Sequence, residues 1–264
     1  DGETRLHLPP ELPPRVVLLR GLHQPNDKLV ELLIAAPAAR ELGACDLVLV
    51  SPYLAYMRQD IAFTPGEAVS QRHIAGLLGR TFDGVVTVDP HLHRIASLDE
   101  VMPGRRHAAL SAAPQLGAFV AAHFMRQGQR PPLLLGPDAE SLQWVGAAAR
   151  AQGLDFGVCT KQRHGDHEVC VALPELPLRG RAVVLMDDVA STGRTLVEAA
   201  TACLVAGAAS VDAAVTHALF VGDALARLHA AGVRQVWSSD AVPHPSAVVP
   251  LAGLLADGVR GLPS

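Results

Sequence analysis

The sequence predicts an α/β protein with two similar units, each a mainly parallel sheet with helices on both faces. Short apolar strands alternate with longer helical patterns along the 264 residues, and the strands are apolar at successive positions. Strands of that kind are typical of parallel sheets that are covered on both faces. The alternation loosens near residues 98–113, which divides the chain into two such series.

Elements of the first series follow from its apolar runs and from residues typical of helix boundaries. The expected strands are residues 15–21, 46–52 and 84–89, and the expected helices are residues 26–43 and about 70–78. We expect an Asn or Asp cap at the start of the first helix, Gly43 at its end and a bend at Pro37. Residues 98–108 are expected to form a loop-rich connection.

The second series repeats this theme with more strands. Its strands are expected at residues 131–138, 182–189, 210–219 and 233–240, and its helices at residues 114–126, at about 140–151, up to about 206, and between the last two strands. Residues 156–161 and 168–173 are expected to pair as a hairpin. The expected domains are residues 1–109 and 110–248, with residues 249–264 returning to the first.

Composition and charge exclude several classes of protein. A hydrophobic share of 49% supplies a core for one large domain or two modest ones. The net charge of -4 offers no basic surface for nucleic acid, and no apolar run in the sequence is long enough to cross a membrane. The four cysteines lack close pairing, so we expect reduced thiols in the cytoplasm that serve as small buried hydrophobes: Cys45, Cys159, Cys170 and Cys203.

The clearest chemical motif is VVLMDDVASTGRTLVEAA, residues 183–200. Asp187 and Asp188 close a strand, and the turn into the next helix is built from small or hydroxyl-bearing residues: Ser191, Thr192, Gly193 and Thr195. Backbone N–H groups and hydroxyls in such a turn bind an anion at a helix N-terminus. The two carboxylates would repel phosphate, so they suit the vicinal hydroxyls of a ribose or a metal between them. The alternative is an ordinary Asp-capped turn.

This loop resembles the phosphoribosyl-diphosphate binding motif shared by type I phosphoribosyltransferases and phosphoribosyl-diphosphate synthetases. Alone it does not separate the two. A second segment, SPYLAYMRQDIAFTPGEAVS at residues 51–70, contains an Arg-Gln-Asp triplet that is either a phosphate- and base-binding loop or a solvated one. It closely resembles the ATP-binding segment of ribose-phosphate diphosphokinases.

Further segments match that family in the same order: residues 1–3, 24–33, 87–94, 136–138 and 216–220. The resemblance implies two domains of phosphoribosyltransferase type. It also implies that one strand and one helix of the first domain would precede residue 1.

The resemblance implies a role for each matched residue in the first domain. Arg58 and Gln59 would bind ATP. Asp1 and Glu3 would contact adenine from a neighbouring subunit, which implies a homo-oligomer built from dimers. His91 would lie by the ATP phosphates and the metal.

In the second domain, the resemblance implies that Asp138 helps to hold Mg²⁺, together with His91. The Asp187–Thr195 loop would bind ribose 5-phosphate. His93 would share a strand face with His91, because successive side chains of a strand alternate; a lone His is more often an ordinary surface or core residue.

The segment CTKQRHGDHEV, residues 159–169, places Lys161 and Arg163 two positions apart before a Gly-Asp turn. The pattern itself is more often that of an exposed hairpin whose charges serve solubility. The family has a catalytic flap with a Lys and an Arg at this spacing, so the resemblance implies that both cations act in the transition state.

The implied reaction moves the diphosphate of ATP to the anomeric hydroxyl of ribose 5-phosphate. Two alternatives are a transferase that consumes phosphoribosyl diphosphate and a non-catalytic homologue associated with a synthetase. The sequence departs from the family at Arg194, where a small residue is usual, and at Ile61 and Ala62, where basic residues are common.

Overall fold

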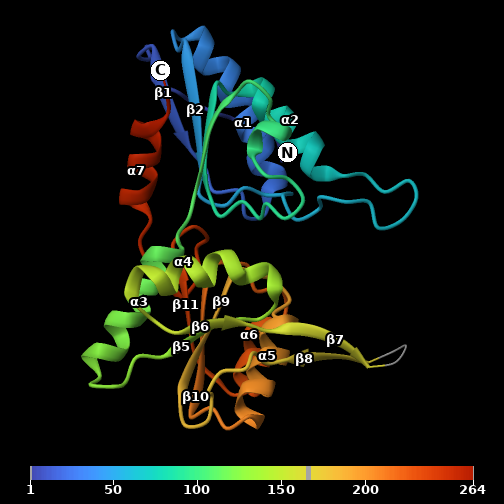
Figure 1. Cartoon of the computed structure of the whole chain (residues 1–264). Coiled ribbons are helices and arrows are strands. Elements are labelled where there is room, and N and C mark those ends of the chain that lie inside the picture. The colour runs from blue at the N-terminus through green and yellow to red at the C-terminus, as the bar shows by residue number, and fades with distance from the viewer. Residues whose placement is uncertain (1, 165–167, 264) are drawn as a thin grey trace. The chain divides into compact units, whose positions relative to one another are not determined.

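The computed structural model describes residues 2–164 and 168–263, with the backbone alone described at residues 161–164 and 168–170. The chain divides into two compact units (Figure 1). Unit 1 comprises Asp1–Leu110 and Leu251–Ser264, and unit 2 comprises Ser111–Pro250.

Unit 1 is a four-stranded sheet in the order β1-β2-β3-β4, and every neighbouring pair in it is parallel. Its strands are β1 (Arg15–Leu19), β2 (Asp46–Ser51), β3 (Gly84–Val88) and β4 (Arg106–Leu110). Its helices are α1 (Pro25–Glu41), α2 (Ser70–Thr81), α7 (Ala252–Gly261) and the short η1 (Leu98–Glu100). Residues 98–108 were predicted to be a loop-rich connection, but β4 begins within them at Arg106. The strand was not recognised because its sequence, RHAAL, begins with two basic or titratable residues, as a strand at a sheet edge can.

Alternate residues of the central strands pack against helices on opposite faces. Leu47 and Leu49 belong to the core under α1 and α2, whereas Val48 and Val50 pack with Leu255 and other residues of the α7 segment. Figure 1 shows α7 on one face of this sheet and α1 and α2 on the other. The predicted parallel sheet with helices on both faces is therefore confirmed.

The predicted cap of α1 was wrong. Gln24, in a left-handed conformation with φ of 49°, is the N-cap, and Pro25 opens the helix. Proline fits the first helical position because its fixed φ suits the helix and its missing N–H has no intrahelical partner there. Asn26 therefore lies inside the first turn, where its side chain accepts a hydrogen bond from Tyr56 Oη at 2.5 Å.

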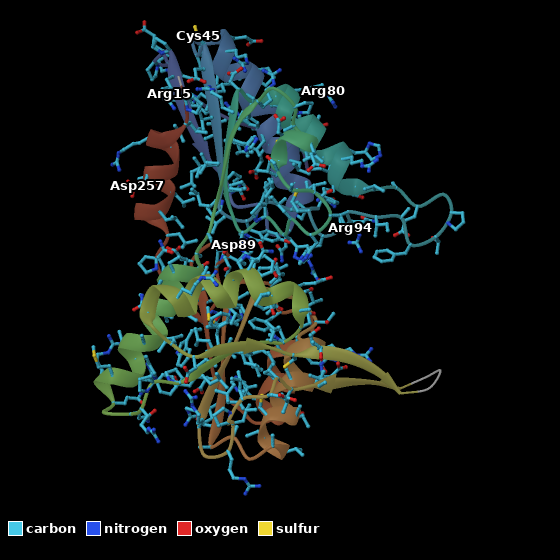
Figure 2. All side chains as sticks on the ribbon, in the orientation of Figure 1. Arg15, Cys45, Arg80, Asp89, Arg94 and Asp257 are labelled. Carbon is cyan, nitrogen blue, oxygen red and sulfur yellow. The ribbon has the colours of Figure 1, made fainter. Side chains whose placement is uncertain are left out.

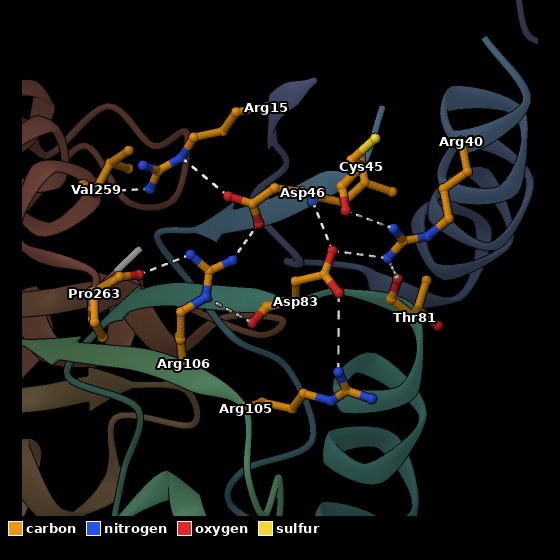
Figure 3. A network of polar contacts seen from close by, with 11 residues as sticks. Arg15, Arg40, Cys45, Asp46, Thr81, Asp83, Arg105, Arg106, Val259 and Pro263 are labelled. Carbon is orange, nitrogen blue, oxygen red and sulfur yellow. Dashed lines mark hydrogen bonds and ion pairs between the residues drawn. The ribbon is translucent and has the colours of Figure 1, made fainter. Parts of the chain in front are cut away.

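Two carboxylates at the amino ends of the strands organise a charge network in unit 1 (Figure 3). Arg15 Nε lies 3.4 Å from Asp46 Oδ2, and Asp46 also forms an ion pair with Arg106. The same two arginines donate to backbone carbonyls of the C-terminal segment, Arg15 to Val259 at 3.4 Å and Arg106 to Pro263 at 2.8 Å. The network thus ties residues that follow unit 2 in the chain to the first sheet.

The second carboxylate, Asp83, has a lowered pKa. Burial alone would raise it, but the backbone N–H of Leu47 donates to Oδ2 at 2.8 Å and Arg40 Nη2 donates to the same oxygen at 2.9 Å. Arg105 adds a weaker attraction at 3.9 Å. These contacts favour the charged form, so they outweigh the cost of burial.

We expect Asp83→Asn to lower the thermal midpoint of unit 1 at pH 7. Since the folded pKa of Asp83 lies below its ordinary value of 3.8, its stabilising effect is complete above that value and is lost as pH falls through the folded pKa. The deficit of the variant should therefore shrink below about pH 4. Melting curves from pH 3 to 8 measure this deficit. Asp257→Asn is the control: it breaks an exposed pair with Arg260 and should leave the thermal midpoint nearly unchanged. A deficit that grows in acid would contradict this assignment.

Unit 2 is a six-stranded sheet in the order β12-β11-β10-β9-β5-β6, with every neighbouring pair parallel. Its strands are β5 (Leu133–Gly136), β6 (Phe156–Val158), β9 (Ala182–Ala190), β10 (Ser210–Ala218), β11 (Val233–Ser239) and β12 (Ala247–Val249). Its helices are α3 (Ala113–Arg126), η2 (Ala139–Ser141), α4 (Leu142–Gln152), α5 (Arg194–Val205) and α6 (Ala224–Ala230). Figure 1 shows α3 and α4 on one side of this sheet and α5 and α6 on the other.

A two-stranded antiparallel ribbon, β7 (Thr160–His164) with β8 (Glu168–Ala172), extends from this sheet (Figure 1). The predicted hairpin is confirmed, but its first strand is not continuous: residues 156–158 form β6 in the main sheet, and the ribbon begins at Thr160. The short strand β12 and helix α7 were not assigned from the sequence.

Helices α3 and α4 pack closely because Gly117 has no side chain. A Cβ atom at this position would lie 2.6 Å from the backbone oxygen of Ala148. No side chain can move aside there, so the two helix backbones would have to separate.

We expect Gly117→Ala to destabilise unit 2 by about 1–3 kcal/mol, the usual range for overpacking. Gly146→Ala on the facing helix is the matched control, because the atoms nearest its Cβ would be the far end of the flexible Arg150 side chain, at 2.9 Å. The control should gain up to about 1 kcal/mol from helix propensity. Urea unfolding of both variants measures their free energies of unfolding. Equal stability of the two would show that the α3–α4 contact is not tight.

Cysteine burial agrees only in part with the prediction. Cys159 and Cys203 are buried free thiols, and burial raises the pKa of each to about 12. Cys45 is also free but exposed, so the prediction of a buried hydrophobe was wrong there. The Cys170 side chain lies outside the described residues. Over the described part of the chain, the helices are too short or too polar to serve as membrane spans.

Candidate active site

The turn after β9 in unit 2 holds the predicted sugar-phosphate loop. Strand β9 runs through Asp187 and Asp188 to Ala190, and Gly193 then caps α5 with φ of 68°. A left-handed φ favours glycine, because other residues are strained there. Two hydrogen bonds fix the loop, one from the turn before α6 and one from α6 itself: Val221 N–H donates to Ser191 O at 3.0 Å, and Arg227 donates to Thr192 O at 3.1 Å.

Arg194 is the bulky residue of this loop, and its side chain lies on the surface of α5. Arg194 is the first residue of α5, its side chain is 82% exposed, and its Nε lies 2.8 Å from Glu198 Oε1 one turn along the helix. The departure from the family pattern at Arg194 is therefore accommodated on the helix surface. Thr195 follows it in the first turn, where the N–H groups of a helix favour an anion.

Three carboxylates gather at the carboxyl edge of β5 and β9, which are neighbours in the sheet. Burial raises the pKa of Asp187 well above its ordinary value, and the nearby charges of Asp188 and Asp138 raise it further. Asp188 is 3% exposed, and its backbone N–H donates to Asp187 Oδ1 at 3.0 Å. Asp138 N-caps η2 by accepting from Glu140 N–H at 3.2 Å. Carboxylates held this close favour a bound cation or hydroxyl donors.

The ribbon β7–β8 carries the predicted flap cations. Lys161 faces Val171 in the antiparallel register, and Arg163 faces Val169. The intervening Gln162 pairs with residue 170, so the two cationic positions share one side of the strand by alternation. The Gly-Asp turn itself lies outside the described residues, and the roles of Lys161 and Arg163 stay predictions.

In unit 1, the segment after β2 carries the predicted ATP-binding residues. Arg58 is exposed, whereas Gln59 is half-buried. The Gln59 amide is held on both sides: its Oε1 accepts from Ser70 Oγ at 2.7 Å, and its Nε2 donates to Glu67 at 3.3 Å. The structure thus leaves the Arg58 cation accessible and orders the residue beside it.

An ion pair between an exposed arginine and a buried carboxylate joins this segment to the segment after β3. Arg94 Nη1 lies 2.8 and 2.9 Å from the two carboxylate oxygens of Asp60, which is 8% exposed. Figure 2 labels Arg94 and Asp89 at this edge of unit 1. Both segments were predicted as binding segments from the sequence, but this ion pair was not, although the Arg-Gln-Asp triplet contains its acidic member.

His91 does not lie on a strand, so the predicted strand face shared with His93 was wrong. Strand β3 ends at Val88, and Asp89 and His91 adopt positive φ values of 38° and 57°. The turn nevertheless brings the two rings together, with His91 Nδ1 3.0 Å from His93 Nε2. Positive φ at non-glycine residues is strained and is often found at functional sites.

The predicted adenine-contacting residues are only partly described. Glu3 is exposed in the segment that precedes β1, and Asp1 lies outside the described residues. Unit 1 therefore brings Arg58, Gln59 and His91 to loops joined by one ion pair. Unit 2 brings Asp138 and the Asp187–Thr195 loop to one sheet edge.

Comparisons with known proteins match two separate segments of the chain, one in each unit. Residues 1–81 match the N-terminal domain of ribose phosphate pyrophosphokinase, and residues 109–235 match the phosphoribosyl transferase domain. The ribose-phosphate pyrophosphokinase of Methanopyrus kandleri is 37% identical over 99% of this chain and 88% of its own length. That of Halobacterium salinarum is 33% identical over 98% of this chain and 89% of its own length.

A solved structure, the phosphoribosylpyrophosphate synthetase from Mycobacterium smegmatis, shares the fold with a TM-score of 0.77 at 24% identity. The match covers 93% of this chain and 80% of that one. The fold and the loop after β9 thus define an α/β protein with domains of phosphoribosyltransferase type. The N-terminal match and the full-length relatives narrow this class, and the chain belongs to the ribose-phosphate pyrophosphokinase family.

Proposed function

We propose that this chain transfers the diphosphate of ATP to the anomeric hydroxyl of ribose 5-phosphate, giving phosphoribosyl diphosphate and AMP. The observation that carries the proposal is the carboxylate pair of β9 beside a hydroxyl-rich turn at a helix start, in a chain 37% identical over nearly its full length to a ribose-phosphate pyrophosphokinase. A new bond joins the anomeric oxygen to the β-phosphorus as the bond to the α-phosphate breaks.

Unit 2 would position the sugar. Its 5-phosphate would accept hydrogen bonds from the Ser191–Thr195 turn. The Asp187 and Asp188 carboxylates would accept from the ribose hydroxyls and so orient the anomeric hydroxyl. Positioning of this kind is the main protein contribution to phosphoryl transfer, which needs little covalent help.

Arg58, Gln59 and His91 of unit 1 would bind ATP. The fixed Gln59 amide and the Asp60–Arg94 pair would keep Arg58 and His91 in ordered loops. Lys161 and Arg163 would donate to the equatorial oxygens of the transferred group, where charge spreads in the transition state.

Mg²⁺ fits the donors of unit 2. Magnesium prefers oxygen ligands, and Asp138, Asp187 and Asp188 offer carboxylate oxygens at one edge of the sheet. We propose Asp138 as a ligand, with His91 as the second implied by family resemblance. Bound Mg²⁺ would supply positive charge to the phosphate oxygens.

We propose a homo-oligomer, supported by exposure of Glu3, a residue expected to reach a neighbour's adenine. A cytoplasmic location is proposed from the free thiols of Cys45, Cys159 and Cys203.

The test is formation of AMP from ATP, Mg²⁺ and ribose 5-phosphate, measured with each substrate omitted in turn. AMP that depends on ribose 5-phosphate supports the proposal. A protein that makes no AMP but consumes phosphoribosyl diphosphate with a nucleobase is a transferase, and one that does neither alone is a non-catalytic homologue.

A further inference from the structure

Unit 2 contains a cleft lined by four arginines, at the edge of the sheet opposite the candidate active site. We propose that this cleft binds the phosphate chain of an oligophosphate ligand, meaning two or more linked phosphate groups. The inference rests on the cleft alone and does not depend on the reaction proposed above.

The cleft has a volume of about 850 Å³ and is built from the amino ends of the strands. Ala182 opens β9, Ser210 opens β10 and Arg234 follows the first residue of β11, and all three line it. The carboxylates Asp187 and Asp188 of the candidate active site lie toward the other end of β9. Asp187 is five positions along the strand from Ala182, which amounts to about 17 Å.

Arginines dominate the charge of the cleft. Four of them line it, against a single lining carboxylate: Arg130, Arg179, Arg181 and Arg234, with Asp155. Two of the four are neutralised, since Arg181 lies 2.8 Å from Asp155 and Arg234 lies 2.6 Å from the buried Asp212. Among residues 2–164 and 168–263, Arg130 and Arg179 have no acidic partner, so the cleft keeps an excess of two positive charges.

Neutral donors complete the lining. Ser210 lines the cleft and is 8% exposed. Its hydroxyl would donate to a phosphate oxygen in the cleft. Gln129, which carries an amide donor, also lines the cleft, and Pro131 and Pro177 form apolar walls.

The size of the cleft and the two unneutralised guanidinium groups select the ligand class. Small-ligand sites span about 300–1,000 Å³, and one phosphate would leave most of this volume empty. Guanidinium groups bind phosphate oxygens in a bidentate manner. Two available arginines with separate stems therefore fit at least two phosphate groups. Inorganic oligophosphate and nucleoside polyphosphate share this chemistry.

The test is hydrogen–deuterium exchange on the full chain, with and without inorganic triphosphate, and in a second arm with ATP. We expect protection of peptides covering residues 129–133 and 177–182. Peptides covering residues 187–196 report the candidate active site separately, so the two sites are distinguished by position. Titration of the same protection should give a dissociation constant at least about tenfold weaker in the Arg130→Ala/Arg179→Ala double variant, because two charge-assisted contacts are lost.

Arg126→Ala is the matched control, since Arg126 is an exposed arginine of α3 outside the cleft lining and should leave protection unchanged. Protection by triphosphate supports an inorganic chain, and protection by ATP alone supports a nucleotide that also uses the apolar walls. Two results would overturn the proposal: protection confined to residues 187–196, or cleft protection that persists in the double variant. Absence of protection in both arms overturns it as well.

Discussion

Replacing Lys161 with Ala should lower the rate of AMP formation by at least about 100-fold while the fold is retained. The expected size is that of removing a single donor that acts on charge developing in the transition state. Lys161 lies on the β7–β8 ribbon, in register with Val171, and contributes nothing to the main sheet of unit 2. The loss should therefore appear in kcat with little change in thermal midpoint.

Two further variants make this prediction specific. Gln162→Ala changes the adjacent strand position, which faces the other side of the ribbon, and should keep most of the activity. Lys161→Arg keeps the charge and should retain more activity than Lys161→Ala. Full activity in Lys161→Ala would remove this residue from the mechanism, and an equal loss in Gln162→Ala would indicate damage to the ribbon instead.

Asp187→Asn is expected to make the protein more stable and nearly inactive. Burial and the charges of Asp188 and Asp138 raise the pKa of Asp187, so its ionised form destabilises the folded state at neutral pH. A neutral amide removes that cost but also removes a carboxylate proposed to hold the ribose hydroxyls. Stability given up at a functional site is commonly recovered in this way by inactivating substitutions.

The stabilising effect of Asp187→Asn should depend on pH. A group with a raised folded pKa binds its proton more tightly when folded, so the folded state loses stability as pH rises from the unfolded value of about 4. The gain in thermal midpoint of Asp187→Asn should therefore be largest near pH 8 and vanish near pH 4. Asp212→Asn is the control: this carboxylate is 1% exposed but paired with Arg234, so its loss should lower the midpoint at pH 8. A lower midpoint for Asp187→Asn would contradict the electrostatic account.

Buried strands could be predicted from the sequence because their apolar runs are continuous. Strands β2, β3 and β9 begin where the pattern placed them. The edge strands β4 and β12 were missed, since a half-exposed strand needs few apolar residues and a short one gives little pattern. Helix α7 was missed as an element, although its segment was expected to return to the first domain.

Side chains that meet through the tertiary fold were beyond sequence reasoning. Asp46 and Arg106 are 60 positions apart, and Asp60 and Arg94 are 34 apart, yet each forms an ion pair. The turn that brings His91 to His93 depends on two residues with positive φ, which no local pattern indicated. The motif residues of the β9 turn were found because strand, carboxylates, hydroxyls and helix start follow one another directly in the chain.

The measurement that tests diphosphate transfer most directly is phosphorus NMR of the reaction products from ATP, Mg²⁺ and ribose 5-phosphate. The account predicts two coupled resonances from a sugar 1-diphosphate, growing in equal proportion to AMP and only when ribose 5-phosphate is present. ADP with a sugar monophosphate or bisphosphate, or free diphosphate without a sugar product, would contradict it.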